Sequence, residues 1–374
     1  MLIKEKPQSR YRRLPVLLVF CTILLFIYFN TPSLFSSNPS KRSTVSLKGL
    51  KKANSTLGFG ALVAVSKAES ARREGLLFAA NITGLDITIP DQKEWNDDDI
   101  MDLVTPEGST MNRGSAMAWL GHLNALRWFV DSGLETALIM EDDVDWDIHL
   151  RTVQVPKVAA AVRQLTNSNA GYWGHPDNWD ILWLGHCGDI NSAEKFNNPN
   201  VTKLSFVDDT LPSREKMHPD MRTFLDRLGI ERDIRMVHKT VFPLCSFAYA
   251  VTQESARKML DPRIAGKEKE GGCMAYDVRL CEVCRDLGFA CWSSNPELFH
   301  HMEAPSEIAN VNLGLHEQGK LGGFAGQHSP NIACGARSRN FYTKDPTALE
   351  YLQEVVGRQG HCLHDQLEED MTMP

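Results

Sequence analysis

A cluster of acidic residues follows an apolar run directly in the stretch 136–147, TALIMEDDVDWD. Residues 137–140 are apolar at consecutive positions, which is typical of a strand covered on both faces of an α/β sheet. Glu141, Asp142 and Asp143 then stand where such a sheet binds ligands, at the carboxyl end of a strand. Adjacent carboxylates repel one another unless a cation neutralises them, and oxygen ligands suit Mn²⁺ or Mg²⁺. The pattern therefore predicts a divalent-cation site that can grip a diphosphate, with a solvated acidic turn as the alternative.

A second group of candidate residues follows the first predicted strand, residues 60–66. Ser66 ends this strand, and Arg72 and Arg73 lie in the first turn of a helix predicted over 69–80. Backbone N–H groups at such a helix start and nearby guanidinium groups can face a phosphate. No Gly-x-Gly-x-x-Gly motif accompanies them, so an exposed basic pair is the alternative.

The clearest predicted helix spans residues 115–131, with Ser115 as its N-cap and Gly133 closing its end. His122 lies in its middle beside Gly121. A glycine inside a helix costs about 1 kcal/mol relative to alanine, so Gly121 indicates close approach of another backbone or of a ligand. His122 is a candidate donor-binding residue, and a structural histidine is the alternative.

Two later residues complete the candidate set. Asp277 stands at the start of a helix predicted over 276–287, where a carboxylate can serve as a general base or bind an acceptor; N-terminal capping is the alternative. His301 follows the last predicted strand and is a candidate for a further metal or diphosphate contact. Its alternative is a surface pair with His300.

The elements that must position these residues form an α/β pattern. Further strands are expected over 85–89 and 179–186, and a strand followed by a short helix over 243–260. Residues 91–102 are expected to form a surface loop with a short helix, whose acids Asp97, Asp98 and Asp99 are solvated and not metal-binding. The polar insertion 191–240 is expected to be partly loop and to lie over the site, and a helix is expected near 346–356.

The chain has 374 residues, of which 43% are hydrophobic and 23% charged, as in a globular protein. Its net charge of −7 argues against nucleic acid as a partner, because phosphate backbones are held by dense Lys and Arg surfaces.

The amino terminus predicts attachment to a membrane. A basic segment over 1–13 precedes an apolar run, so residues 14–30 are expected to form a transmembrane signal anchor, with residues 31–56 as a stem. The rest would face the lumen of the Golgi or endoplasmic reticulum, as a single-pass type II protein. A cleaved signal peptide is the alternative.

Features of the body agree with a lumenal location. Asn54, Asn81 and Asn200 begin Asn-x-Ser/Thr tripeptides, the acceptors of N-glycosylation. Eight cysteines lie beyond the anchor, so disulfides are the default expectation in an oxidising compartment. Cys281 and Cys284 have zinc-like spacing, but no second pair of ligands follows at a suitable distance.

The succession GSAMAWLGHLNALRWFVDSGLETALIMEDDVDWD, residues 114–147, resembles the signature of glycosyltransferase family 25, which includes procollagen galactosyltransferases and lipopolysaccharide glycosyltransferases. The match includes Gly114, His122 and the acidic triplet 141–143. Ser115 and Gly121 depart from it, since the family commonly has Glu and Ser there. The resemblance extends over about residues 60–301.

This resemblance implies a GT-A-like α/β fold with a central mixed sheet flanked by helices, here preceded by one N-terminal transmembrane helix. It places the catalytic domain over 57–309 and leaves a Gly-rich segment and C-terminal extension over 310–374. It also implies inverting transfer of a sugar, galactose or a related hexose, from a UDP-sugar donor to a glycan or glycoprotein hydroxyl.

The residues given above then take roles in that reaction. Mn²⁺ or Mg²⁺ would be held by Glu141, Asp143 and His301, and Asp277 would be the base. The donor would be bound by Ser66, Arg72, Arg73, His122, Glu141 and Asp142. Two other functions stay open: a metal-dependent glycan hydrolase, and a catalytically inactive member that binds a glycan or a partner protein.

Overall fold

The computed structural model describes residues 50–105, 107–189, 202–302, 306, 308, 311–312, 323–325 and 329–363. All of these belong to one compact unit, Ser43–Pro374. The expected cytoplasmic tail and anchor, and most of the expected stem, lie outside the described residues. Over the part of the chain that is described, no helix has both the length and the apolar character needed to cross a membrane.

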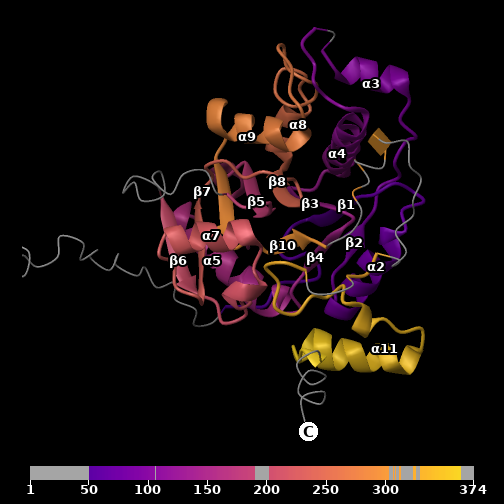
Figure 1. The fold of residues 1–374 in the computed structure, drawn as a ribbon. Coiled ribbons are helices and arrows are strands. Elements are labelled where there is room, and N and C mark those ends of the chain that lie inside the picture. Colours follow the sequence, from indigo (N-terminus) through magenta and orange to yellow (C-terminus); the bar gives the residue numbers. More distant parts are fainter. Residues whose placement is uncertain are drawn as a thin grey trace, which may run out of the picture. The chain divides into compact units, whose positions relative to one another are not determined.

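A mixed β-sheet forms the centre of this unit (Figure 1). Its strands run in the order β2-β1-β3-β8-β5-β9-β7-β6, while β10 pairs with both β4 and β5. The strands are β1 (Ala61–Val65), β2 (Ile87–Thr88), β3 (Thr136–Glu141), β4 (Val144–Trp146), β5 (Ile181–Gly185), β6 (Lys203–Val207), β7 (Ile234–Lys239), β8 (Ala248–Thr252), β9 (Cys291–Asn295) and β10 (Phe299–His301). The predicted α/β class with a central mixed sheet is confirmed.

Strand direction brings several strand ends to one edge. β1 is parallel to β2 and β3, and β8 runs antiparallel between β3 and β5. β5 is in turn parallel to β9. The carboxyl ends of β1, β3, β5 and β9 therefore meet at the same edge of the sheet, which is where a ligand site is expected.

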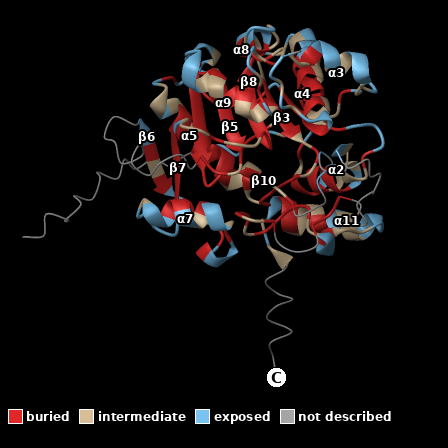
Figure 2. Ribbon diagram, turned by 45° about the horizontal axis from the view of Figure 1, so that its top comes forward, coloured by how far each residue is buried: buried red, intermediate tan, exposed pale blue. Residues whose placement is uncertain are grey.

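Helices cover both faces of the sheet. On one face lie α2 (Arg72–Thr83), α5 (Val155–Leu165) and the π-helix η6 (Gln353–Arg358), and on the other α4 (Arg113–Ser132), α8 (Gln253–Met259) and α9 (Tyr276–Asp286). Leu138 and Met140 of β3 face the first core, whereas Ala137 and Ile139 face the second. Figure 2 shows the strands in red between helices whose outer turns are pale blue. This double burial explains the consecutive apolar residues of β3.

The remaining helices among the described residues are short. They are α3 (Asp97–Leu103), η2 (Leu150–Gln154), η3 (Pro176–Asn178), η4 (Arg214–Lys216), α7 (Pro219–Arg227), η5 (Arg339–Phe341) and α11 (Pro346–Leu352). The short helix expected among the acids of 91–102 and the helix expected near 346–356 are thus confirmed.

Helix α4 begins two residues earlier than predicted. Its N-cap is Asn112, whose Oδ1 accepts a hydrogen bond of 2.8 Å from the backbone N–H of Ser115. The assignment of Ser115 as the N-cap was therefore wrong, whereas Gly133 closes the helix as predicted, with φ of 71°. A Cβ at Gly121 would lie 3.0 Å from Val65 Cγ1. The glycine thus makes room for the Val65 side chain of β1, and no backbone of another described segment approaches it as closely.

The insertion after β5 is a structured edge of the sheet. Residues 202–240 contain β6, α7 and β7, and β7 pairs with β9. A small separate core that includes Met217, Phe224 and Met236 supports them. In the order of strands β6 is the last, far from β3, whereas the ring of His218, just before α7, lies 5.9 Å from that of His300 in β10, next to His301. That these residues lie over the site stays a prediction.

Three disulfides join Cys187 to Cys245, Cys284 to Cys291, and Cys334 to Cys362. Cys273 and Cys281 are buried free thiols. The expectation of disulfides holds for six of the cysteines. It fails for these two, which pack into the core beside α4 and α9.

Candidate functional site

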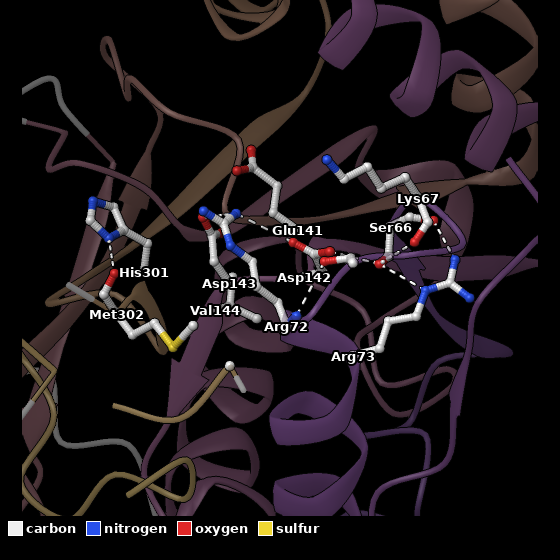
Figure 3. A network of polar contacts seen from close by, with 12 residues as sticks. Ser66, Lys67, Arg72, Arg73, Glu141, Asp142, Asp143, Val144, His301 and Met302 are labelled. Carbon is white, nitrogen blue, oxygen red and sulfur yellow. Dashed lines mark hydrogen bonds and ion pairs between the residues drawn. The ribbon is translucent and has the colours of Figure 1, made fainter. Parts of the chain in front are cut away.

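The acidic turn, residues 141–143, links β3 to β4 and binds the start of α2. Arg72 Nη1 lies 2.7 Å from Asp143 Oδ2 and 3.4 Å from Asp142 Oδ1 (Figure 3). Ser66 Oγ, just beyond β1, donates a hydrogen bond of 2.6 Å to Asp142 Oδ2. The ends of two parallel strands and the first turn of a helix thus bring together residues that are about 70 positions apart.

Arg73 lies on the β1 side of this group. Its Nε donates to Ser66 Oγ at 3.0 Å, and its Nη2 donates to the Ser66 carbonyl at 2.6 Å. Both predicted arginines therefore lie near the acids, but only Arg72 pairs with them directly.

Asp143 carries an oxygen without a hydrogen-bond partner. Its Oδ1 is buried, and none of the described residues donates to it. Burial and the nearby Glu141 carboxylate raise the pKa of Asp143 to about 6, although the Arg72 charge opposes this. Buried polar atoms are almost always paired in folded proteins, so an unpaired carboxylate oxygen beside other carboxylates fits a bound cation.

Glu141 is held by residues from the opposite side of β3. Ser246 Oγ donates to Glu141 Oε1 at 2.8 Å, and His122 Nε2 lies 3.6 Å from the same oxygen. Burial favours the neutral acid, but the His122 and Ser246 contacts outweigh it and lower the pKa of Glu141. The Glu141 side chain remains 31% exposed, so it can meet a ligand as an anion.

His122 is only 2% exposed and belongs to a buried aromatic group. Its ring stacks on Tyr276 with centroids 4.7 Å apart, and its Nδ1 lies 3.2 Å from the Tyr249 hydroxyl. The two tyrosine hydroxyls are 3.0 Å apart, and burial raises the pKa of each. His122 therefore contacts the acidic turn through Glu141. Its ring is buried, so little of it is open to direct contact with a donor.

His301 of β10 lies beside the acidic turn, because β10 pairs with β4 and places His301 opposite Val144. Its Nδ1 donates to the Met302 carbonyl at 2.7 Å, and Met302 N–H donates to the Asp143 carbonyl at 2.9 Å. A histidine whose Nδ1–H binds a carbonyl has Nε2 as its ligand atom, the usual arrangement in metal sites.

These residues fit a divalent cation in chemistry but are not assembled around one. Among the described residues, no three His, Cys, Asp or Glu side chains are grouped closely enough to hold an ion. Arg72 bridges two of the carboxylates. A cation would have to compete with this guanidinium for the carboxylates. The unpaired Asp143 Oδ1 is the oxygen that it could bind first.

Asp277 lies at the first turn of α9, as predicted, and binds two backbone amides. Its Oδ2 accepts from Cys245 N–H at 2.8 Å, and its Oδ1 accepts from Val278 N–H at 2.8 Å. The first of these contacts ties α9 to the disulfide-bonded loop before β8. No hydrogen bond or ion pair found among the described residues joins Asp277 to the acidic turn.

Arg337 is a residue at this site that sequence reasoning missed. It is completely buried. Its Nη1 donates to the carbonyls of Asp142 at 2.6 Å and Val144 at 2.9 Å, and its Nη2 donates to the Arg72 carbonyl at 2.8 Å. An arginine in the stretch Gly-Ala-Arg-Ser follows no motif, so only the fold reveals its position.

Neither a known family model nor a curated protein matches this chain significantly. The resemblance to glycosyltransferase family 25 stays a prediction. What the protein does must be inferred from the acidic turn and the residues around it.

Proposed function

We propose that this protein is a glycosyltransferase with a GT-A-like fold. It would transfer galactose or a related hexose from a UDP-sugar to a hydroxyl of a glycan or glycoprotein, with inversion. The observation that carries the proposal is the unpaired, buried Oδ1 of Asp143, in a carboxylate that feels the charge of Glu141 and is paired with Arg72 through its other oxygen. A nucleotide-sugar site needs carboxylates that bind a cation and guanidinium groups that bind phosphate oxygens.

Glu141, Asp143 and His301 are the proposed ligands of Mn²⁺ or Mg²⁺. When bound, the ion would supply Lewis acidity that offsets the charge of the leaving diphosphate. Arg72 would exchange the carboxylates for phosphate oxygens, which a guanidinium binds in a two-pronged geometry. Arg73 would add charge at the end of β1.

Neighbouring residues would keep the acids ready. Ser66 fixes Asp142 through the hydrogen bond of 2.6 Å, and Ser246 fixes Glu141 through that of 2.8 Å. His122 favours the ionised form of Glu141, which is the form that a cation requires. Together these residues would hold the acidic side chains in place before the ligand binds.

Asp277 remains our proposed base for the acceptor hydroxyl. Inversion needs a base on the face of the sugar opposite the leaving group. Asp277 is partly exposed, and its two amide bonds use only two of the four lone-pair positions of a carboxylate.

The proposed location is the membrane of the Golgi or endoplasmic reticulum, with the body in the lumen. Disulfides persist in such an oxidising compartment. Asn54 and Asn81 are exposed, as glycosylation would require, whereas Asn200 lies outside the described residues.

The proposal is tested by calorimetric titration of the full chain with UDP, with and without Mn²⁺. We expect Mn²⁺-dependent binding in the wild type and at least about tenfold weaker binding in Asp143→Asn, which keeps the shape but loses the charge. Asp209→Asn is the matched control, because Asp209 is an exposed acid that forms an ion pair with Lys157 away from the acidic turn. A folded wild-type protein that binds no UDP under either condition would overturn the proposal.

Turnover separates the remaining functions. A transferase consumes UDP-sugar and releases UDP, whereas an inactive binding protein does not. A glycan hydrolase cleaves glycan without any dependence on UDP-sugar.

A further inference from the structure

Arg337 belongs to the C-terminal segment, residues 329–341, and none of its side chain reaches solvent. Burial lowers the pKa of Arg337 to about 10, so the guanidinium still carries its charge at neutral pH. Burying such a charge is costly unless its donors are all used and acids lie nearby. Its place in the fold therefore needs an explanation.

The donors of Arg337 bind main-chain carbonyls. Besides the bonds to Asp142, Val144 and Arg72, its Nε donates to the Gly323 carbonyl at 2.8 Å. The carboxylates of Asp145, Asp142 and Asp143 compensate its charge through space. Arg337 thus holds the backbone of separate segments and leaves the acidic side chains free for other partners.

Two of these bonds hold the main chain around Asp143. The carbonyls of Asp142 and Val144 flank Asp143, and a single nitrogen of Arg337 binds both. The Asp142 carbonyl lies in the peptide plane before Asp143, and Met302 N–H holds the plane after it through the Asp143 carbonyl at 2.9 Å, so Arg337 and Met302 together orient the Cα–Cβ bond of Asp143.

A third bond fixes the partner of Asp143. Arg337 Nη2 holds the carbonyl of Arg72, and the side chain of Arg72 lies 2.7 Å from Asp143 Oδ2. One guanidinium therefore sets the placement of the acidic turn relative to the start of α2.

The C-terminal segment is itself anchored to β4 and the residues that follow it. Asp145 Oδ1 accepts from the Arg337 N–H at 2.9 Å, and its Oδ2 accepts from Ser329 Oγ at 2.7 Å. Cys334 N–H donates to Asp147 Oδ2 at 2.9 Å, and Cys334 is disulfide-bonded to Cys362. Arg337 is therefore held on a fixed support.

We propose that Arg337 is a positioning residue, which holds the acidic turn and Arg72 in the relative placement that a divalent cation and a diphosphate require. The ligands in this statement rest on the proposed function, whereas the placement does not. Lysine cannot replace arginine here, because one ammonium group cannot reach carbonyls on three separate segments.

The test compares Arg337→Lys with Arg235→Lys in the full chain. Arg235 is a matched control: it is 1% exposed and also binds carbonyls, those of Pro296 and Glu297, but it lies on β7, which pairs with β6 and β9 and makes no pair with β3 or β4. The first measurement is amide hydrogen exchange without added metal. We expect at least about tenfold faster exchange over residues 142–146 in Arg337→Lys and no change there in Arg235→Lys.

The second measurement is Mn²⁺ affinity by electron paramagnetic resonance. Loss of a residue that orients metal ligands typically weakens binding by about 10- to 100-fold. We expect a loss of that size in Arg337→Lys only.

Equal acceleration of exchange over 142–146 in both variants, or none in Arg337→Lys, would overturn the inference. Should Arg337→Lys not fold, Ser329→Ala removes only the hydrogen bond to Asp145 and should still accelerate exchange over 142–146; unchanged exchange there would likewise overturn it. A wild-type protein that binds neither Mn²⁺ nor UDP would instead defeat the proposed function, while hydrogen exchange still decides the role of Arg337.

Discussion

Arg72 supplies the positive charge that Asp142 and Asp143 require in the structure. Its side chain is only 12% exposed, so the ion pairs are weakly screened by water. The same guanidinium would serve the diphosphate in the proposed reaction. In the proposed reaction, binding of the cation and release of Arg72 from the acids would therefore be linked.

Because of this linkage, substitution of Arg72 should change the affinities for Mn²⁺ and for UDP in opposite directions. Arg72→Gln should strengthen binding of Mn²⁺ alone by several-fold, because a competing cation is lost. It should weaken UDP binding in the presence of Mn²⁺ by about 10- to 100-fold, since a hydrogen bond to a charged group contributes about 1.5–3 kcal/mol. Titration with Mn²⁺ first and UDP second measures both.

Arg113→Gln is the control for this experiment, because Arg113 pairs with Asp97 at the surface. Parallel weakening of both affinities in Arg72→Gln would mean that Arg72 only supports the fold of the acidic turn.

At the scale of residues, the sequence predicts the acids and arginines but not their supports. Glu141 to Asp143 are recognisable because an apolar strand precedes them. Ser246 reaches Glu141 across 105 positions, and Arg337 reaches Asp142 across 195. Such contacts leave no local pattern, so the fold is needed to find them.

At the scale of elements, burial patterns predict strands well when both faces are covered. The paired edge strands β6 and β7 were missed because the surrounding polar residues and prolines suggested a loop. Yet β6 alternates, with Leu204 and Phe206 buried and Lys203 and Val207 exposed. Alternation of this kind is typical of a strand with one solvated face.

The start of α4 was misplaced because both Asn and Ser are good N-caps, and only geometry distinguishes them. Asn112→Ala should lower the free energy of unfolding by about 1 kcal/mol, because it removes the bond to Ser115 N–H. Ser115→Ala should change it by less than about 0.5 kcal/mol, as a side chain without a capping role does. Chemical denaturation of both variants checks this, and a larger loss in Ser115→Ala would restore the sequence-based assignment.

At the scale of the whole molecule, the half of the sheet that contains β5, β9 and β7 carries the buried histidines His186 and His238. His238 donates from Nδ1 to the Lys239 carbonyl at 2.9 Å, and its Nε2 lies 2.7 Å from Asn295 Nδ2. Burial lowers the pKa of His238 to about 4, and burial also lowers the pKa of His186. The His238 ring is therefore neutral in the folded protein over much of the pH range in which an unfolded chain would protonate it.

This difference predicts how stability depends on pH. The unfolded chain protonates His238 near its ordinary pKa of 6.5, and the folded protein does so near 4. Stability is therefore complete above pH 6.5 and declines as the pH falls towards 4, with a loss from His238 of about 2 kcal/mol at pH 5.

His238→Gln keeps a polar side chain that does not titrate. Denaturation at pH 7 and pH 5 should therefore show a smaller loss in this variant than in the wild type, by about 2 kcal/mol. The same loss in both proteins would contradict the assignment. Other titrating groups, His186 among them, contribute to both and cancel in the comparison.

The hydrogen bonds of Arg337 to the acidic turn can form only late in synthesis of the chain. Arg337 follows the Asp142 carbonyl that it binds by 195 positions. At about 5–20 residues per second, the acidic turn emerges roughly 10–40 s before the arginine that holds it. A nascent chain therefore carries an acidic turn that is not yet fixed in place, and the proposed site is completed only when the C-terminal segment has been made.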